Sequence, residues 1–185
     1  MSEAGARGKR RRLDATALWE YALRLLGRRA QSQSELRRKL ATRAEREEDV
    51  DPLIDRLREY GYLDDARFAE TFAGARLAND RLGKSRVLRD LRSKRVAPAV
   101  AEKAVREAYS GIDETVLIEE FAERRILRHG SGERLNDPKE LASAYRKLVR
   151  AGFRAADILN VLRRLAREPG MMDGFEPPAE PAEDS

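Results

Sequence analysis

Gly83-Lys84-Ser85 is the segment of the sequence that comes nearest to a chemical motif, because it matches the end of a phosphate-binding loop. The complete motif requires glycine at position 78, where this chain has Ala78, and a preceding strand, which the sequence does not predict. The segment therefore predicts no nucleotide site. The helix expected to begin near Ser85 could still hold a phosphate of nucleic acid through its free amides and Lys84.

Residues suited to acid–base, nucleophilic or metal chemistry are scarce. The sequence has no cysteine, which excludes disulfides, thiolate nucleophiles and cysteine-ligated metals. Its one histidine, His129, precedes Gly130 at an expected helix end, where a cationic imidazole would favour the helix dipole. The adjacent Asp64 and Asp65 do not face each other on a helix, and a capping role explains them. We therefore expect no enzyme, no metal site and no cofactor.

Basic side chains, above all arginine, are the functional groups that the sequence offers in quantity. Lys and Arg number 38 against 33 Asp and Glu, and charged residues make up 38% of the chain, compared with roughly 25% in an average globular protein. Residues 1–14 hold five basic and two acidic residues, and residues 168–185 hold six acidic and no basic residues, so the formal net charge of +5 leaves +8 for residues 15–167. This basic body predicts a polyanionic partner or an acidic protein surface, unless coding bias alone explains the arginines.

Helices must position these side chains, because the apolar residues recur with helical spacing and no segment alternates as a strand would. We therefore predict an all-α fold of about nine helices. Helix starts are marked by Asp14, the Ser32–Glu35 capping box, Asp51 before Pro52, Asp64 or Asp65, Asp113, and Asp137 before Pro138. Trp19 lies in the first helix, where core packing is the expectation and stacking on a nucleic-acid base the alternative.

The predicted helices form three sets of three, which align as a tandem repeat. The middle helices superimpose on their last core leucines, Leu40, Leu91 and Leu148. The other apolar columns are Leu36, Val87 and Ala144; Val96 and Phe153; Ala101 and Ile158; and Val105 and Leu162. The predicted organisation is a disordered basic tail (1–13), three three-helix repeats (14–63, 64–111 and 112–168) and a disordered acidic, proline-rich tail (169–185). Stacked in line, such repeats form an elongated, curved body.

The same alignment brings three arginines, Arg38, Arg89 and Arg146, into one column. Each precedes its core leucine by two residues, about 200° around the helix, which places it on the solvent face. Neighbouring basic residues extend this stripe. The candidate residues for binding nucleic acid or a protein partner are Arg38, Lys84, Arg86, Arg89, Lys139, Arg146 and Arg150. A solvated helix face without a function is the alternative.

The segment Leu57–Ala69, with the sequence LREYGYLDDARFA, is similar to the block gyl(d/n)D-x-rfA of the RecX family of bacterial regulatory proteins. Two further segments, Ser34–Leu40 (SELRRKL) and Gly83–Leu91 (GKSRVLRDL), resemble other blocks of that family, and the resemblance covers about residues 17–167. The family often has a glycine before the apolar residue that opens the sixth helix. This chain has Arg95-Val96 there, so we expect a less tightly turned junction.

The resemblance implies tandem three-helix repeats without catalysis. It also implies binding to the filament that the RecA recombinase forms on DNA, with limits on filament growth, strand exchange and ATP hydrolysis. The expected partners are therefore the RecA filament and, without sequence preference, single- and double-stranded DNA. Two points stay open: whether the basic residues contact DNA phosphates or acidic patches of RecA, and whether the protein caps the filament or lies along it.

A stand-alone DNA-binding regulator built from helix-turn-helix-like units is the alternative function, and sequence-specific binding to duplex DNA would distinguish it. The sequence has no run of about 18 apolar residues and no apolar segment of the signal-peptide type at its N-terminus. We expect a cytoplasmic monomer without membrane contact.

Overall fold

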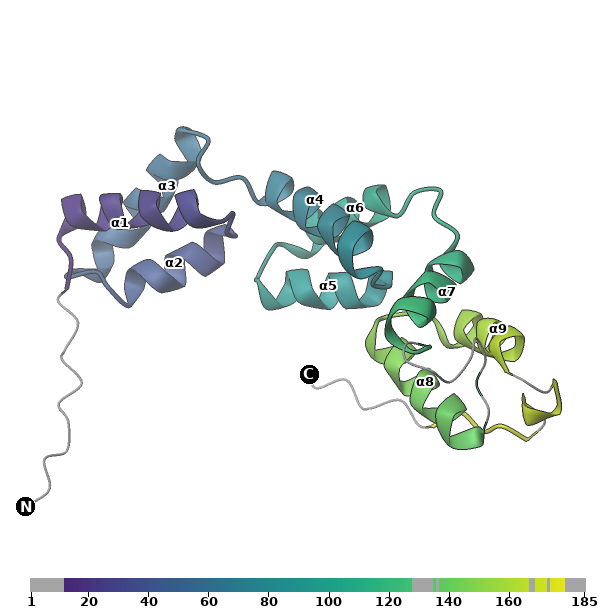
Figure 1. Ribbon diagram of the computed structural model, residues 1–185. Helices are drawn as coiled ribbons and strands as arrows, with labels where there is room; N and C mark the ends of the chain where they lie inside the picture. Colours follow the sequence, from purple (N-terminus) through teal and green to yellow (C-terminus); the bar gives the residue numbers. More distant parts are fainter. Residues whose placement is uncertain (1–11, 128–134, 136, 167–168, 173, 179–185) are drawn as a thin grey trace, which may run out of the picture. The chain divides into compact units, whose positions relative to one another are not determined.

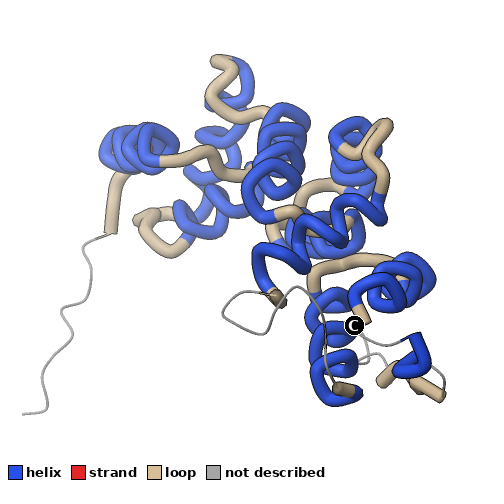
Figure 2. Tube along the Cα trace, turned by 45° about the vertical axis from the view of Figure 1, so that its right-hand side comes forward, coloured by secondary structure: helices blue, strands red, loops and turns tan. Residues whose placement is uncertain are grey.

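The computed structural model describes residues 12–127, 135, 137–166, 169–172 and 174–178. Within these residues the regular structure is helical, and the only extended pairings are two isolated parallel bridges, Leu13 with Ala44 and Leu135 with Ala166. The coloured part of the tube in Figure 2 accordingly shows helices and loops. The predicted all-α fold class is confirmed.

Nine α-helices occur in the described part of the chain (Figure 1). They are α1 (Ala15–Arg28), α2 (Gln33–Ala41), α3 (Val50–Glu59), α4 (Asp65–Ala75), α5 (Lys84–Ser93), α6 (Pro98–Ala108), α7 (Glu114–Arg125), α8 (Pro138–Arg150) and α9 (Ala155–Leu165). Three shorter elements accompany them: the 3₁₀ helices η1 (Glu47–Asp49) and η3 (Pro169–Met172) and the π-helical segment η2 (Arg76–Asp80). None of the described helices combines the length and the apolar character needed to cross a bilayer.

The chain forms two compact units. Unit 1 comprises Met1–Phe68 and Lys94–Ala97, and unit 2 comprises Ala69–Ser93 and Pro98–Ser185. In unit 1, helices α1, α2 and α3 enclose a core that includes Leu18, Ala22, Leu36, Leu40, Ile54 and Leu57. In unit 2, α5 packs on α6, and α9 packs on α7 and α8.

The apolar columns of the repeat are buried throughout. The residues in these columns are all at most 6% exposed: Leu36, Val87, Ala144, Leu40, Leu91, Leu148, Val96, Phe153, Ala101, Ile158, Val105 and Leu162. A tandem repeat is expected to bury the same positions in each three-helix set, because each set builds its core from the same apolar columns. The predicted core positions are therefore confirmed.

Most helix starts follow the predicted capping residues. The side chains of Asp14, Asp113 and Asp137 each accept a hydrogen bond from an amide of the first turn, and Asp64 caps α4 through the amides of Ala66 and Arg67. These bonds satisfy donors that a helix leaves unpaired at its N-terminus.

The capping box at α2 is only half formed. Ser32 accepts from the Glu35 amide at 3.1 Å, as predicted. The Glu35 carboxylate does not reciprocate, because it forms ion pairs with Arg29 and Lys39 instead. Two cations outcompete one backbone amide for the same carboxylate.

The predicted start of α3 is wrong. The turn η1 precedes it, α3 begins at Val50, and Asp51 lies inside its first turn rather than at its cap. The Asp51 carboxylate is occupied elsewhere, since it accepts from Arg37 Nε at 2.6 Å and Nη2 at 2.8 Å. A bidentate arginine pair is stronger than a single bond to a backbone amide.

The expectation for the junction before α6 is also wrong. Arg95 has φ +56°, in the left-handed region where glycine is usual, so the turn is as tight as a glycine turn. The following Val96 is buried, and its burial holds the backbone in this conformation.

The prediction that residues 1–13 and 169–185 are disordered is wrong for parts of both tails. Leu13 exchanges backbone hydrogen bonds with Arg43 and Glu45, and Arg12 Nη1 donates to the Ala44 carbonyl at 2.9 Å. In the C-terminal segment, η3 contacts α9, and the Phe175 ring lies 6.2 Å from that of Tyr145. Leu13 and Phe175 are apolar residues that gain from burial. Residues 1–11, 128–134 and 179–185, which include His129, lie outside the described residues.

Candidate nucleic-acid interface

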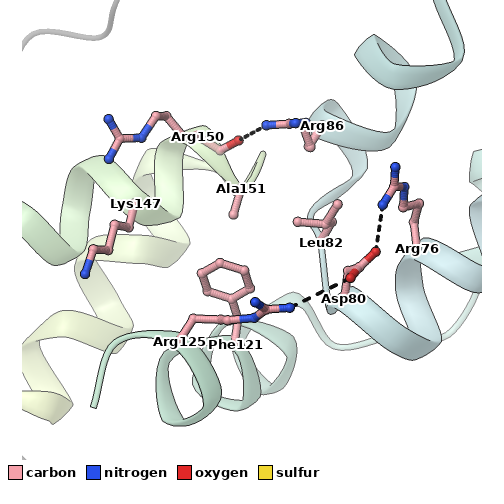
Figure 3. A pocket seen from close by; sticks show the side chains of 9 residues that line it. All are labelled: Arg76, Asp80, Leu82, Arg86, Phe121, Arg125, Lys147, Arg150 and Ala151. Carbon is pink, nitrogen blue, oxygen red and sulfur yellow. Dashed lines mark hydrogen bonds and ion pairs between the residues drawn. The ribbon is translucent and has the colours of Figure 1, made fainter. Parts of the chain in front are cut away.

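Unit 2 contains a hollow of about 410 Å³ with a strongly cationic wall (Figure 3). We call it the basic pocket. It is lined by Arg76, Asp80, Leu82, Arg86, Phe121, Arg125, Lys147, Arg150 and Ala151. Five of these residues are cations and one is a carboxylate, so the wall carries a large positive excess.

A close approach of two backbones sets the shape of the basic pocket. The Gly83 amide, just before α5, donates to the Ala151 carbonyl, just after α8, at 2.8 Å. A Cβ on Gly83 would lie 2.3 Å from the Gly152 oxygen, and a Cβ on Gly152 would lie 2.2 Å from the Arg86 nitrogen. Both distances are too short for any side chain, so the two glycines allow Arg86 and Arg150 to lie on the same wall.

The end of α8 is held by two of the predicted binding residues. Arg86 Nη1 and Arg89 Nη2 each donate to the Arg150 carbonyl at 3.4 Å, the first of which is drawn in Figure 3. This carbonyl is one of those that a helix leaves unpaired at its C-terminus, where positive charge is also favoured by the helix dipole. These two arginines therefore have a structural role besides any role in binding.

Carboxylates neutralise part of the basic pocket. Arg76 pairs with Asp80 at 2.8 Å, and Arg125 lies 3.8 Å from the same carboxylate (Figure 3). Arg86 pairs with Asp90 at 2.9 Å. These acids fix the orientation of three guanidinium groups and lower the net charge on that side.

Lys147 and Arg150, on the last turn of α8, supply the charge that is not neutralised. Both are exposed, and neither side chain forms an ion pair with any described residue. Figure 3 shows both residues across from the Arg76–Asp80 pair, with their charged ends directed away from it. An incoming anion would meet these two groups without first displacing a carboxylate of the protein.

The buried phenol of Tyr109 supports the floor of this region. Its hydroxyl donates to the Leu82 carbonyl at 2.6 Å. Burial, with a smaller effect from the charge of Glu114, raises the pKa of Tyr109 well above its usual range, so the phenol keeps its proton. It therefore acts as a fixed donor that anchors the segment leading into α5.

The structure places the seven predicted binding residues in different surroundings. Arg86 and Arg150 line the basic pocket and Arg89 lies beside it, bound to the same carbonyl. Lys139 and Arg146 are exposed on α8, at positions that share a face with Arg150. Lys84 points to Glu114 at 3.8 Å, and Arg38 is exposed on α2 in unit 1.

The sequence analysis did not predict three of the residues that line the basic pocket, namely Arg76, Arg125 and Lys147. Lys147 could have been found, because it precedes Arg150 by three residues on the same helix. Arg76 and Arg125 lie near the ends of α4 and α7, and only tertiary packing brings them together.

The motif-like segment Gly83-Lys84-Ser85 does not form an anion cradle. The Gly83 amide is used by Ala151, and Lys84 is directed to Glu114. The alternative expectation, that this helix start holds a phosphate through free amides and Lys84, is therefore not supported by its geometry. Within the described residues, no group of three or more His, Cys, Asp or Glu is arranged to hold a metal ion.

Comparison with known proteins places the chain in a family. The profile of the first three-helix domain of RecX matches residues 19–57, and that of the second three-helix domain matches residues 64–105. A regulatory protein RecX from Halorhodospira halophila is 34% identical over 158 residues, which cover 85% of this chain and 89% of the relative. The chain belongs to the RecX family. Another relative of the same name, from Pseudomonas putida, is 34% identical over 74% of this chain and 83% of its own length.

Solved structures support the same fold for this RecX-family protein. The crystal structure of RecX from Lactobacillus salivarius superimposes with a TM-score of 0.65 at 18% identity and covers 82% of this chain and 96% of its own. A second structure, of a regulatory protein RecX, gives a TM-score of 0.60. At this level of identity the likeness concerns the fold alone.

Proposed function

We propose that this RecX-family protein is a non-catalytic regulator that binds the RecA–DNA filament and restrains recombination, and that its basic pocket holds DNA phosphates. The observation that carries the proposal is the lining of a hollow of about 410 Å³, which includes five cationic residues and one carboxylate. Family membership supports a regulatory role, and the pocket supports an anionic target.

The chemistry of the basic pocket favours phosphate groups over bases. Guanidinium and ammonium groups bind phosphate through charge and hydrogen bonds, and such contacts carry no information on base sequence. The basic face of α8 extends the pocket through Lys139 and Arg146, which gives a chain of phosphates more than one point of contact. Binding should therefore be non-specific and strongly dependent on salt.

Removing the two unpaired cations tests the pocket directly. The double variant Lys147→Ala with Arg150→Ala should reduce the slope of log affinity against log salt by about 2, because each residue contacts one phosphate. It leaves the Arg150 carbonyl in place, so Arg86 and Arg89 keep their acceptor. Fluorescence anisotropy with a labelled DNA of mixed sequence measures the effect at several salt concentrations.

A matched control removes the same charge elsewhere in unit 2. Lys103 and Arg106 are exposed on α6 and do not line the basic pocket. The double variant Lys103→Ala with Arg106→Ala should keep the wild-type salt slope. Equal losses in both double variants would show that only the overall charge matters, which contradicts a phosphate site in the pocket.

The regulatory part of the proposal is tested with RecA itself. Adding the wild-type protein at a stoichiometric ratio should slow RecA-promoted strand exchange and DNA-dependent ATP hydrolysis, and the pocket variant should inhibit less than the control variant. No inhibition by the wild-type protein would contradict the role at the filament. A strong preference for one duplex sequence would instead favour the helix-turn-helix-like regulator.

A further inference from the structure

Unit 1 presents a group of three aromatic side chains, two of them exposed, that the proposed function does not use. Trp19 on α1 meets Tyr60 and Tyr62, which follow α3, with ring centroids 5.9 and 6.5 Å away, and the two tyrosines are 6.5 Å apart. We call these three residues, with Arg56, the aromatic patch. Tyr60 is 58% exposed and Tyr62 is 54% exposed, although tyrosine usually buries most of its ring.

Core packing accounts for Trp19 but not for the two tyrosines. Trp19 is partly buried and packs against the core of unit 1, as the sequence predicts. Tyr60 and Tyr62 lie outside that core, which is filled beside them by Leu57 and Leu63, both at most 5% exposed. Gly61, with φ +71°, turns the chain between the two tyrosines. The turn buries Leu63 and leaves both phenol rings on the surface, so their exposure is built into the local backbone.

Arg56 adds a cation that is oriented but not neutralised. Its guanidinium lies 4.5 Å from the Trp19 ring centroid and 5.3 Å from that of Tyr60. The neighbouring Arg58 pairs with Asp55, but Arg56 forms no ion pair with the described residues. Its N–H donors therefore remain available to an acceptor that approaches the rings.

We propose that the aromatic patch binds unpaired bases of single-stranded nucleic acid. Every base has a π-face that stacks on an aromatic ring or a guanidinium plane, whatever its sequence. The Arg56 donors would meet a phosphate or a base edge next to the stacked base. Bases in a duplex are already stacked on each other, so the patch should favour single strands.

This binding mode differs from that of the basic pocket in a measurable way. The pocket acts by charge and releases counterions, whereas stacking does not. Loss of the two tyrosine rings, with Arg56 kept, should thus lower the affinity for single strands without a change of salt slope or of duplex affinity. Binding of single strands by the patch does not depend on any action on RecA. The experiments below can therefore contradict this inference without contradicting the proposed function, and the other way round.

Trp19 is the only tryptophan of the chain and reports on the patch directly. Titration of the full chain with oligothymidylate should change its emission, and an equally long duplex should change it much less. The double variant Tyr60→Ala with Tyr62→Ala should lose at least about fivefold in affinity for oligothymidylate. Tyr60→Phe with Tyr62→Phe keeps the rings and should keep the affinity, while circular dichroism confirms that each variant folds.

An unchanged affinity for oligothymidylate in the folded alanine variant would overturn the inference. If that variant had also lost binding to RecA, the patch would be a docking site for protein instead.

Discussion

The turns at Arg95 in unit 1 and at Gly152 in unit 2 occupy equivalent positions of the repeat. Each precedes an apolar residue that is buried, Val96 or Phe153. Both have positive φ, +56° at Arg95 and +90° at Gly152. The same backbone turn is thus made by an arginine in one unit and by a glycine in the other.

The contacts of the two turns differ as well. In unit 1 the Ser32 hydroxyl donates to the Lys94 carbonyl at 2.7 Å. In unit 2 the partner is the Gly83 amide, which donates to the Ala151 carbonyl at 2.8 Å. A side chain therefore makes the first contact, and backbone makes the second.

The space around each turn depends on whether a side chain or the backbone makes its contact. At the first turn there is room for polar side chains, and the Lys94 ammonium lies 3.8 Å from the Glu35 carboxylate. At the second turn there is no room for a Cβ on either glycine. The free energy of unfolding should therefore depend on pH through the turn in unit 1, where a larger side chain can be accommodated. At the turn in unit 2 an added side chain should be strongly destabilising, and pH should have little effect.

The largest expected effect is that of Gly152→Ala. A methyl group there would lie 2.2 Å from the Arg86 nitrogen, a backbone atom, at a φ that disfavours alanine. We expect a loss of about 3 kcal/mol or more in the free energy of unfolding, from overpacking and backbone strain together. Urea unfolding followed by circular dichroism measures it. Weaker DNA binding should accompany the loss, since Ala151 and Arg86 line the basic pocket.

Gly27→Ala is the control for this change. Nothing lies within 4 Å of a Cβ at Gly27, which is inside α1. Alanine is the better helix former, so this variant should gain up to about 1 kcal/mol. If Gly152→Ala behaved like the control, the close approach of the two backbones would be refuted.

Local signals in the sequence were sufficient to predict most of the helices of the fold. Capping aspartates such as Asp113 act within one turn, so their role can be predicted from neighbouring residues alone. The cap assigned to Asp51 failed because its competitor, Arg37, comes from another helix. Left-handed arginines at positions 81 and 95 also escaped prediction, because the surrounding packing holds them in a conformation that arginine rarely adopts.

The candidate site shows the same limit. Arg86 and Arg150 could be predicted from the repeat and its basic stripe, whereas Arg76 and Arg125 could not. Their positions depend on how α4 and α7 end, and α4 ends in the π-helical segment η2, closed by Arg81 with φ +54°. No local pattern in the sequence predicts that segment.

A change of pH should affect the turn in unit 1 selectively. Burial alone would raise the pKa of Glu35, but hydrogen bonds from Arg29 and Lys39 and the charge of Lys94 outweigh it and lower the pKa to about 2. The ordinary value of 4.5 applies in the unfolded chain. The carboxylate thus stabilises the fold fully above pH 4.5, and the stabilisation is lost as the pH falls toward 2.

The expected contribution is about 1–2 kcal/mol, less than the full shift would give, because Arg29 and Lys39 are partly exposed. In Glu35→Gln the free energy of unfolding should be lower at pH 7 and should vary less between pH 5 and pH 2.5 than in the wild-type protein. Urea unfolding at a series of pH values measures this. Parallel pH profiles for both proteins would show that Glu35 does not carry the stabilisation.

The smallest expected effect comes from making the two turns alike. Arg95→Gly relieves the left-handed strain, which costs roughly 1–2 kcal/mol for a residue with a Cβ, and part of this gain is offset by the larger freedom of glycine in the unfolded chain. The Arg95 side chain is exposed, so little packing is lost. We expect the free energy of unfolding to rise by about 0.5–1 kcal/mol.

Arg92→Gly, an identical change at an exposed position inside α5, should lower the free energy of unfolding by about 1 kcal/mol. Both variants lose the same charge and the same side chain, so changes of opposite sign in the free energy of unfolding would be due to the backbone conformation at position 95. Changes of the same sign would mean that Arg95 is not strained.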